Sequence, residues 1–389
     1  MKNKIINLDN ASNYRMRKEI INIYKKIISD EYISNPSSFH NLGRYSKSYI
    51  EISREKISNI INCDPSEIIF TSSGTEGNNI ILRNVVKNYN IKYIVSSKLE
   101  HLSVLNTIKD LKKENKIKVF FIDNDKFGNL NLNKLKNIIK KKRNKYNILV
   151  SIMYVNNEIG NINNINKIGK ICNKYNVLFH SDFVQYIGHY NINVKKILCH
   201  FFSVSAHKFY GPLGIGFIYI KTGYFLTSFI TGGNQERSIR SGTENLYGIV
   251  CMYKALKICN INYYSEKKYI LNLKKYCIFL LNKNIKNLKY NGLSNKINKS
   301  VYNILNLRLP IKDDLLHIKL DLKKIIISKG SSCYNNKKES HVIKNILNKK
   351  DLNRTTSIRI SFSIYNKKKD IVIFVKELKK IILKVKKLC

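Results

Sequence analysis

Short apolar runs that alternate with helical stretches are the feature of this sequence that most constrains its fold. Runs of this kind recur through the first 220 residues, and helical stretches separate most of them. They lie at 66–73, 91–96, 117–122, 147–154, 176–182, 200–205 and 214–220. Continuous apolar runs predict strands buried on both faces, and strands that alternate with helices predict a mainly parallel sheet covered by helices. The sequence therefore predicts an α/β fold with a seven-stranded type of sheet.

The pattern changes after about residue 243. Two long helical stretches, at 243–260 and 265–284, precede strands at 300–309, 323–328 and 356–363 and a Lys-rich helix from 367. We expect this part to form a smaller α+β domain, with the N-terminal segment packed near it. The predicted division is a large domain over 15–255 and a small domain over 1–14 and 256–389.

The charge of the chain raises a nucleic-acid hypothesis. Lys and Arg total 70 against 26 acidic residues, for a formal charge of +44, and basic side chains neutralise phosphates. The lysines are dispersed through predicted helices, strands and loops, as an AT-rich coding sequence would produce. This dispersion favours a compositional origin and predicts no dedicated nucleic-acid site. No run approaches the roughly 20 uncharged apolar residues of a membrane span, so no membrane segment is predicted.

The eight cysteines indicate a reduced, intracellular protein. No pair has CxxC spacing, so neither a zinc site nor a thioredoxin-like motif is predicted. Cys333 differs from the others because Gly and Ser flank it in SKGSSC. Such neighbours are typical of an accessible loop, whereas the other cysteines sit among apolar residues.

Two polar residues at strand ends suggest cofactor chemistry. Lys208, in SAHK, follows an apolar run and precedes a Gly-containing segment. Desolvation lowers the pKa of such an amine and makes it a nucleophile for aldehydes, as a pyridoxal phosphate Schiff base requires; an ordinary surface lysine is the alternative. Asp182, in HSDFVQ, could pair with a protonated pyridine nitrogen, or could cap the helical stretch expected after it.

Three further motifs have a functional and a structural interpretation. SSGTEGNN (72–79) joins a strand to a helix through a Gly turn, which favours an anion site with Thr75 as a hydroxyl donor. His101 follows the strand at 91–96 and could stack on a planar cofactor, or be structural. Arg359 lies within a strand and could clamp a carboxylate, or form a structural salt bridge.

These residues are expected to meet, because ligands of open α/β sheets bind at the carboxyl ends of the strands. The residues at predicted strand ends are Thr75, His101, Asn157, Asp182, Ser205 and Lys208. We expect one site built by separate loops.

The same strings resemble a known family, the cysteine desulfurases of the NifS/IscS type, which are fold-type I pyridoxal phosphate enzymes. The matches follow the family order over nearly the whole chain, from LDNAS (8–12) to TSIRIS (356–361). The most specific strings are VNNEIG, HKFYGPLGIG, ERSIRSGT and the Gly-Ser-x-Cys loop.

The resemblance implies a role for each residue at the reacting centre. Lys208 would form the Schiff base and shuttle protons, and Asp182 would pair with the pyridine nitrogen. His101 would stack on the ring and act as acid and base, while Gln185 would contact the ring hydroxyl. Cys333 would accept the sulfur.

The resemblance also implies how the cofactor phosphate and the substrate are held. Arg359 and Asn157 would bind the substrate carboxylate. Thr243, in RSGT, would reach the phosphate of a neighbouring subunit, which implies a homodimer. Thr75, Ser205 and His207 would hold the phosphate within the subunit. The implied cofactor-binding residues are Gly74, Thr75, Asn157, Asp182, Gln185, Ser205, His207, Lys208 and Thr243.

The implied function is the pyridoxal phosphate-dependent removal of sulfur from L-cysteine, which gives L-alanine and a persulfide on Cys333. The sulfur would supply iron–sulfur cluster assembly, tRNA thiolation or both. An aminotransferase and a selenocysteine lyase are the alternatives within the same cofactor. The Gly-Ser-x-Cys loop argues against a transaminase, and the choice between cysteine and selenocysteine stays open.

Three expectations concern partners, location and packing. The expected acceptor is an IscU-like scaffold, a tRNA-thiolation enzyme or both. The chain ends at Cys389 without the longer tail that many IscS-type enzymes use near the scaffold, which argues against the scaffold. A cytoplasmic location is expected, since the family match begins within the first ten residues. Phe183 stands where the family usually has a small residue, and is expected to crowd the region behind the cofactor ring.

Overall fold

A computed structural model describes residues 5–114, 117–142, 147–330 and 340–388. Its centre is a seven-stranded sheet in the order β2-β8-β7-β6-β5-β3-β4. β8 pairs antiparallel with β2 and β7, and the other pairs are parallel. The strands are β2 (Ile68–Thr71), β3 (Ile91–Ser97), β4 (Lys118–Ile122), β5 (Asn147–Ser151), β6 (Leu178–Asp182), β7 (Phe201–Ser205) and β8 (Gly216–Ile220). The predicted α/β fold with a mainly parallel sheet is confirmed.

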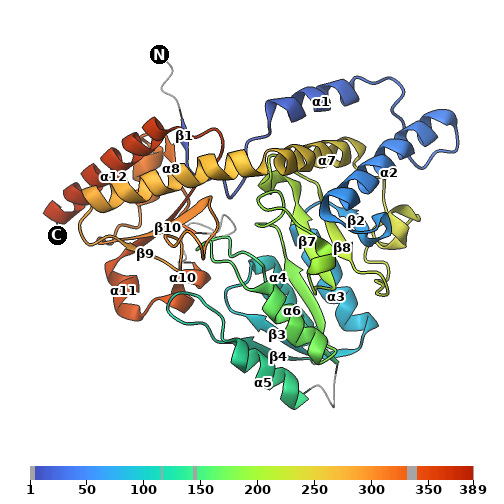
Figure 1. The fold of residues 1–389 in the computed structure, drawn as a ribbon, viewed down its shortest axis with the longest axis horizontal. Coiled ribbons are helices and arrows are strands. Elements are labelled where there is room, and N and C mark those ends of the chain that lie inside the picture. The colour runs from blue at the N-terminus through green and yellow to red at the C-terminus, as the bar shows by residue number, and fades with distance from the viewer. Residues whose placement is uncertain (1–4, 115–116, 143–146, 331–339, 389) are drawn as a thin grey trace.

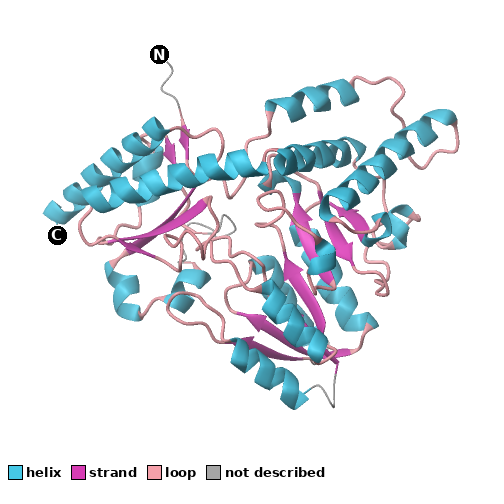
Figure 2. Ribbon diagram, viewed as in Figure 1, coloured by secondary structure: helices cyan, strands magenta, loops and turns pink. Residues whose placement is uncertain are grey.

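Helices cover both faces of the sheet (Figure 2). Along β5, Leu149 packs on one side, while Ile148 and Val150 pack on the other, as the two-residue period of a strand requires. α3 and α4 cover the Leu149 side, and the remaining helices of this part pack on the opposite side. The helices are α1 (Lys18–Ile28), α2 (Asn41–Ile61), α3 (Gly74–Asn88), α4 (Leu102–Glu114), α5 (Leu132–Lys142), α6 (Ile165–Lys174) and α7 (Leu246–Ile261).

The C-terminal part has a smaller antiparallel sheet in the order β12-β10-β9. Figure 1 shows α7 and α8 as a nearly continuous rod that joins the two parts, with α12 alongside α8. The strands are β9 (Lys289–Tyr290), β10 (Ile304–Leu309) and β12 (Thr356–Ser361). The helices are α8 (Tyr263–Asn284), α9 (Leu316–Asp321), α10 (His341–Ile346), α11 (Lys349–Arg354) and α12 (Lys368–Leu388).

The N-terminal segment lies against the C-terminal part, as expected. β1 (Ile6–Asn7) pairs in parallel with β11 (Ile325–Ile326). The strand expected at 323–328 is therefore shorter than predicted, because its partner strand has only two residues. Ser328 instead exchanges backbone hydrogen bonds of 2.8 and 3.1 Å with Arg359 on β12. In the part of the chain that the structure describes, no helix is long and apolar enough to cross a membrane.

A buried ion pair holds a strained turn beside the central sheet. Arg54 on α2 donates two hydrogen bonds to Glu236, of 2.9 and 2.7 Å, and the Phe70 amide donates a third of 2.6 Å. Both charged side chains are at most 4% exposed. Glu236, Arg237 and Ser238 all have positive φ, at 46°, 57° and 61°, and the left-handed conformation costs about 1–2 kcal/mol per residue. The ion pair therefore stabilises a turn that the local sequence disfavours. This turn is η4 (Gln235–Ser238); the other short helices are η1 (Pro65–Glu67), η2 (Val194–Lys196) and η3 (Ala206–Lys208).

We predict that Arg54→Met lowers the free energy of unfolding by about 3–5 kcal/mol, because it leaves the Glu236 carboxylate buried without its cation. Ser238→Gly should raise it by up to about 1 kcal/mol, because glycine adopts positive φ without strain. Chemical denaturation measures both. Glu377→Gln, which removes an ion pair with the exposed Lys380, is the control and should change the free energy by less than about 1 kcal/mol. A similar loss for Arg54→Met and Glu377→Gln would contradict the anchoring role.

Candidate active site

A cavity of about 170 Å³ lies where loops from the central sheet meet β12 and the N-terminal segment. It contains most of the site residues that the sequence predicted. Those in its wall are Gly74, Thr75, His101, Asn157, Asp182, Gln185, Ser205, His207, Lys208 and Arg359. The structure therefore brings the separate motifs into one place, although it does not itself test the role expected of each residue.

Two predicted site residues are not in this cavity wall. Thr243 lines a separate cavity of about 70 Å³ with Ser72 and Arg240. Cys333 lies outside the described residues. The cavity therefore has the predicted amine, carboxylate and imidazole, while the predicted thiol is not part of the described structure.

The Lys208 amine points toward the N-terminal segment. Its Nζ donates hydrogen bonds to the carbonyl oxygens of Ala11, at 2.8 Å, and Ser12, at 2.7 Å. Its backbone carbonyl accepts a bond of 2.8 Å from His189 Nε2. Lys208 ends η3, directly after β7, so the strand end and the buried imidazole both fix its backbone. The amine is thus part of the cavity wall and not an ordinary surface lysine.

Asp182 lies at the carboxyl end of β6, and both of its carboxylate oxygens accept hydrogen bonds. The Val184 amide donates to Oδ1 and Asn78 Nδ2 donates to Oδ2, both at 2.9 Å. The helical stretch expected directly after Asp182 is wrong, because residues 184–186 form a turn and the next helix is the short η2, which begins only at Val194. The carboxylate therefore closes a turn and does not cap a helix, and it stays in the cavity wall.

The N-terminus of α3 forms one corner of the cavity, referred to as the α3 anion corner because the start of a helix attracts negative charge. Ser73 caps the helix by accepting from the Glu76 amide, and the Gly74 amide donates to Ser205 Oγ at 2.6 Å. A Cβ atom at Gly74 would lie 2.4 Å from Val184 Cγ2, so only glycine fits between these elements. The first amides of a helix lack intrahelical partners and carry a partial positive charge, which favours a phosphate or carboxylate.

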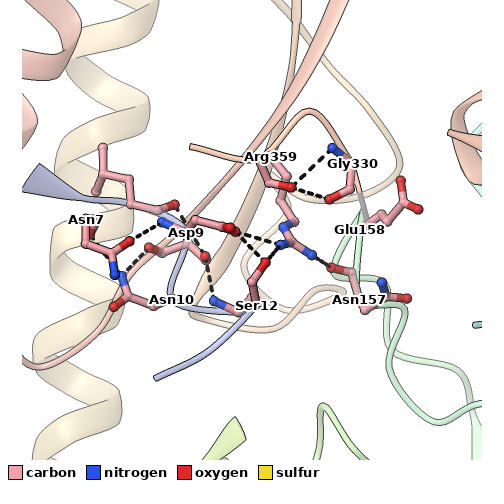
Figure 3. Close-up of polar contacts among 12 residues, drawn as sticks. Asn7, Asp9, Asn10, Ser12, Asn157, Glu158, Gly330 and Arg359 are labelled. Carbon is pink, nitrogen blue, oxygen red and sulfur yellow. Dashed lines mark hydrogen bonds and ion pairs between the residues drawn. The ribbon is translucent and has the colours of Figure 1, made fainter. Parts of the chain in front are cut away.

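Arg359 crosses from β12 into the cavity wall (Figure 3). It donates to the Asn157 carbonyl oxygen and to Asp9 Oδ1, both at 2.7 Å, and to Ser12 Oγ at 2.6 Å. Its Nε is buried without a hydrogen-bond partner, as is Gln185 Oε1. The structural salt bridge that the sequence left open is therefore present, with Asp9 as the acid. The unpartnered donor and acceptor leave hydrogen bonds for a ligand to make.

Several residues around the site escaped prediction. Asp9 and Ser12 lie in LDNAS, a string that shows the resemblance but suggested no role. Asn78 and Ser103 are buried on α3 and α4. The sequence of a helix does not distinguish a buried polar residue near a site from an exposed one. Ser103 could have been found from the sequence by its position, because it lies two residues after the predicted site residue His101. Phe183 packs in the apolar core, stacked on Phe202 with ring centroids 4.4 Å apart, and is not among the residues that line the cavity. Its expected position behind the cofactor ring stays a prediction.

The histidines next to the Lys208 backbone are neutral near pH 7. Burial lowers the pKa of His189 to about 4. Burial, and then the Lys208 charge, lowers the pKa of His207 to about 4. Neutral His189 can donate from Nε2 to the Lys208 carbonyl while Tyr302 donates to its Nδ1, at 3.1 Å.

We predict that His189 makes the stability of the fold depend on pH. Its folded pKa of about 4 lies below the ordinary value of 6.5, so the unfolded chain binds the proton more readily. The contribution is fully present above pH 6.5 and falls by about 3 kcal/mol as the pH drops to 4. His189→Gln, which can still donate to the Lys208 carbonyl, should remove this dependence in denaturation measured at pH 7 and pH 4.5. An unchanged slope would contradict the assignment.

Comparison with known proteins finds one family model and relatives that share one name. The family model Aminotransferase class-V matches residues 6–374. The chain is 37% identical to cysteine desulfurase IscS of Dictyoglomus turgidum, over 94% of this chain and 91% of the relative. It is 36% identical to cysteine desulfurase IscS of Buchnera aphidicola subsp. Baizongia pistaciae, over 92% and 87%.

Solved structures agree with these relatives. A NifS-like protein matches with a TM-score of 0.88 and 30% identity, over 97% of this chain and 99% of the other. A NifS-like protein from Rickettsia africae matches with a TM-score of 0.85 and 32% identity, over 97% and 99%. The sequence and structural matches thus cover both parts of the fold.

Proposed function

On the basis that the chain belongs to the class-V aminotransferase family and is a cysteine desulfurase of the NifS/IscS type, we propose a role for each residue of the site. Pyridoxal phosphate is the cofactor, and L-cysteine is the substrate from which sulfur is removed. We propose that the cofactor occupies the 170 Å³ cavity and that Cys333 receives the sulfur as a persulfide, with L-alanine as the other product. The observation that carries this proposal is the meeting of Lys208, Asp182 and the α3 anion corner in one cavity.

The residues present fit pyridoxal phosphate. Gly74 and Ser205 shape the corner where a phosphate would lie, and Thr75 and His207 are in the same cavity wall. Gln185 Oε1, buried and without a partner, could accept a hydrogen bond from the ring hydroxyl. Asp182 would pair with the ring nitrogen and Lys208 would provide the amine that reacts with the aldehyde.

The bound cofactor supplies an electron sink for the negative charge that develops on the substrate α-carbon. Asp182 supports that chemistry because its carboxylate, fixed by two donors, would hold a proton on the ring nitrogen. Lys208 Nζ would carry the α-proton, and the carbonyls of Ala11 and Ser12 mark where the amine can rest as a hydrogen-bond donor. His101, also in the wall, would stack on the ring.

Substrate binding would use the arginine that already contacts the wall. We propose that Arg359 and Asn157 hold the cysteine carboxylate, with the donor at Arg359 Nε available to it. The ion pair with Asp9 keeps the guanidinium in place before substrate binds. A guanidinium keeps its positive charge and carries several N–H donors, so it can bind a carboxylate while it keeps its contacts with the wall.

The described ends of the segment that carries Cys333 support its role. Ser328 bonds to the Arg359 backbone, and Ser340 Oγ donates to Glu158 Oε2. A Cβ built on Gly330 would lie 3.3 Å from the same carboxylate oxygen, and Figure 3 shows Gly330 and Glu158 beside Arg359. These contacts place Ser328, Gly330 and Ser340, the described residues on both sides of 331–339, next to Arg359 and Glu158.

We predict that Cys333→Ser keeps the yellow absorption of the bound cofactor and loses nearly all turnover, because a hydroxyl cannot carry the sulfur. Lys208→Ala should lose the Schiff-base absorption itself. Absorption spectra, and the alanine and sulfide released from L-cysteine with a thiol, measure the two effects. Cys63→Ser, at a half-buried thiol away from the cavity, is the matched control. Turnover at the wild-type rate by Cys333→Ser would show that another group accepts the sulfur.

We also propose a homodimer in which Thr243 completes the cofactor site of the partner. Thr243 does not line the cavity that holds Lys208, and its own cavity also contains Arg240, which pairs with Glu76 on α3 at 3.0 Å. Thr243 is also exposed, which supports a role outside its own subunit.

For this proposal we predict that sedimentation equilibrium gives twice the chain mass. Thr243→Val should leave that mass unchanged and lower the affinity for pyridoxal phosphate roughly tenfold, as expected for one lost hydrogen bond to a charged group. Equilibrium dialysis measures the affinity. A monomer that binds the cofactor with full affinity would rule out the proposal.

Location, domain division and the sulfur acceptor are further parts of the proposal. The six cysteines that the structure describes are all free, which supports a reducing compartment such as the cytoplasm. Two apolar clusters, one on the central sheet and one in the C-terminal part with Ile6 and Leu8, support domains over 15–255 and over 1–14 with 256–389. The relatives named IscS support delivery of sulfur to an iron–sulfur scaffold, with a tRNA-thiolation enzyme as the other acceptor.

A further inference from the structure

A buried chain of hydrogen bonds connects Asp182 with His101 through two residues that have no assigned role. Asn78 on α3 donates to Asp182 Oδ2 at 2.9 Å and to Ser103 Oγ at 2.8 Å. Ser103 Oγ lies 2.8 Å from His101 Nδ1. Asn78 is fully buried and Ser103 is 9% exposed, so water does not compete strongly for these bonds. The group expected at the ring nitrogen and the group expected to stack on the ring are thus linked inside the protein.

The direction of these bonds follows from their chemistry. An ionised carboxylate only accepts, so the Asn78 nitrogen must face Asp182. The Asn78 oxygen then faces Ser203 Oγ and accepts a hydrogen bond of 2.6 Å from it. Both amide hydrogens of Asn78 are used, one on Asp182 and one on Ser103. Ser103 Oγ accepts from Asn78, which leaves its own proton to donate to His101.

The tautomer of His101 follows from the backbone. The Ser103 amide lies 3.1 Å from His101 Nδ1 and can only donate. A proton on Nδ1 would face this amide proton directly, so Nδ1 of the neutral ring must be the acceptor. The ring proton is therefore on Nε2.

We propose that Asn78 and Ser103 are positioning residues that hold His101 as the Nε2–H tautomer and tie its ring to the Asp182 carboxylate. Nε2 is then a hydrogen-bond donor, the form that serves as the acid in the acid–base role expected of His101. The tautomer assignment stands on hydrogen-bond geometry alone. Only the effect on turnover rests on the proposed function.

The direct test is nitrogen NMR of the holoenzyme labelled with ¹⁵N-histidine, with the His101 signals identified by their loss in His101→Gln. At neutral pH, Nδ1 should give the signal of an unprotonated acceptor and Nε2 that of a protonated nitrogen. A proton on Nδ1 in the wild-type enzyme overturns the proposal. This measurement requires no turnover, so it remains decisive even if the assay for alanine and sulfide fails and the proposed function with it.

A series of substitutions tests the chain of hydrogen bonds from Asp182 to His101. Ser103→Ala removes one donor to Nδ1 and should lower kcat roughly tenfold, a part of the typical contribution of a general acid, with KM for cysteine changed less than about twofold. Ser103→Thr keeps the hydroxyl and should restore kcat. Ser96→Ala is the matched control, because it deletes a fully buried hydroxyl that donates to the Ser151 carbonyl at 2.8 Å, outside the cavity wall.

The outcomes are distinct. Equal losses in Ser103→Ala and Ser96→Ala, or no recovery in Ser103→Thr, would show that Ser103 only supports the fold. Asn78→Ala should shift the His101 Nδ1 resonance, because Ser103 loses the donor that orients its hydroxyl. An unchanged resonance in a folded Asn78→Ala enzyme would break the proposed link to Asp182. If Asn78→Ala does not fold, the wild-type spectrum and the Ser103 series still decide.

Discussion

The parallel alignment of β3, β5, β6 and β7 is the constraint on which the site depends. Parallel strands end at one edge of the sheet, so residues that lie far apart in the chain are brought together there. β6 delivers Asp182 there, β7 delivers Lys208, and the turn after β2 delivers the start of α3. The antiparallel β8 fills the space between β2 and β7, which brings Gly74 next to Ser205.

Three buried arginines of this basic chain are paired with its scarce acids. Arg17 pairs with Glu266, Arg54 with Glu236 and Arg359 with Asp9. Each pair joins segments far apart in sequence, and removing one partner would leave a costly unpaired charge. The excess lysines described on the helices are mostly exposed, which agrees with a compositional origin for the charge of +44.

Residues at strand ends could be predicted because apolar runs mark the strands, and the carboxyl ends of parallel strands share one edge of the sheet. That logic found Lys208 and Asp182 and gave the fold class. It failed for Asn78 and Ser103, whose hydrogen bonds depend on how α3 and α4 pack together. It also failed for the segment after Asp182, which was expected to be helical. The apolar residues there pack in the core from a turn. Contacts made only after folding have no period in the sequence.

The contacts of the first residues with the last have a consequence for biosynthesis. Ile6 pairs with Ile325, Asp9 with Arg359, and Ala11 with the Ser361 hydroxyl. The carbonyls that receive the Lys208 amine are therefore in place only when almost the entire chain has emerged from the ribosome. A nascent chain, or a fragment released early, lacks this support. The enzyme is thus assembled as a whole before it can handle a reactive form of sulfur.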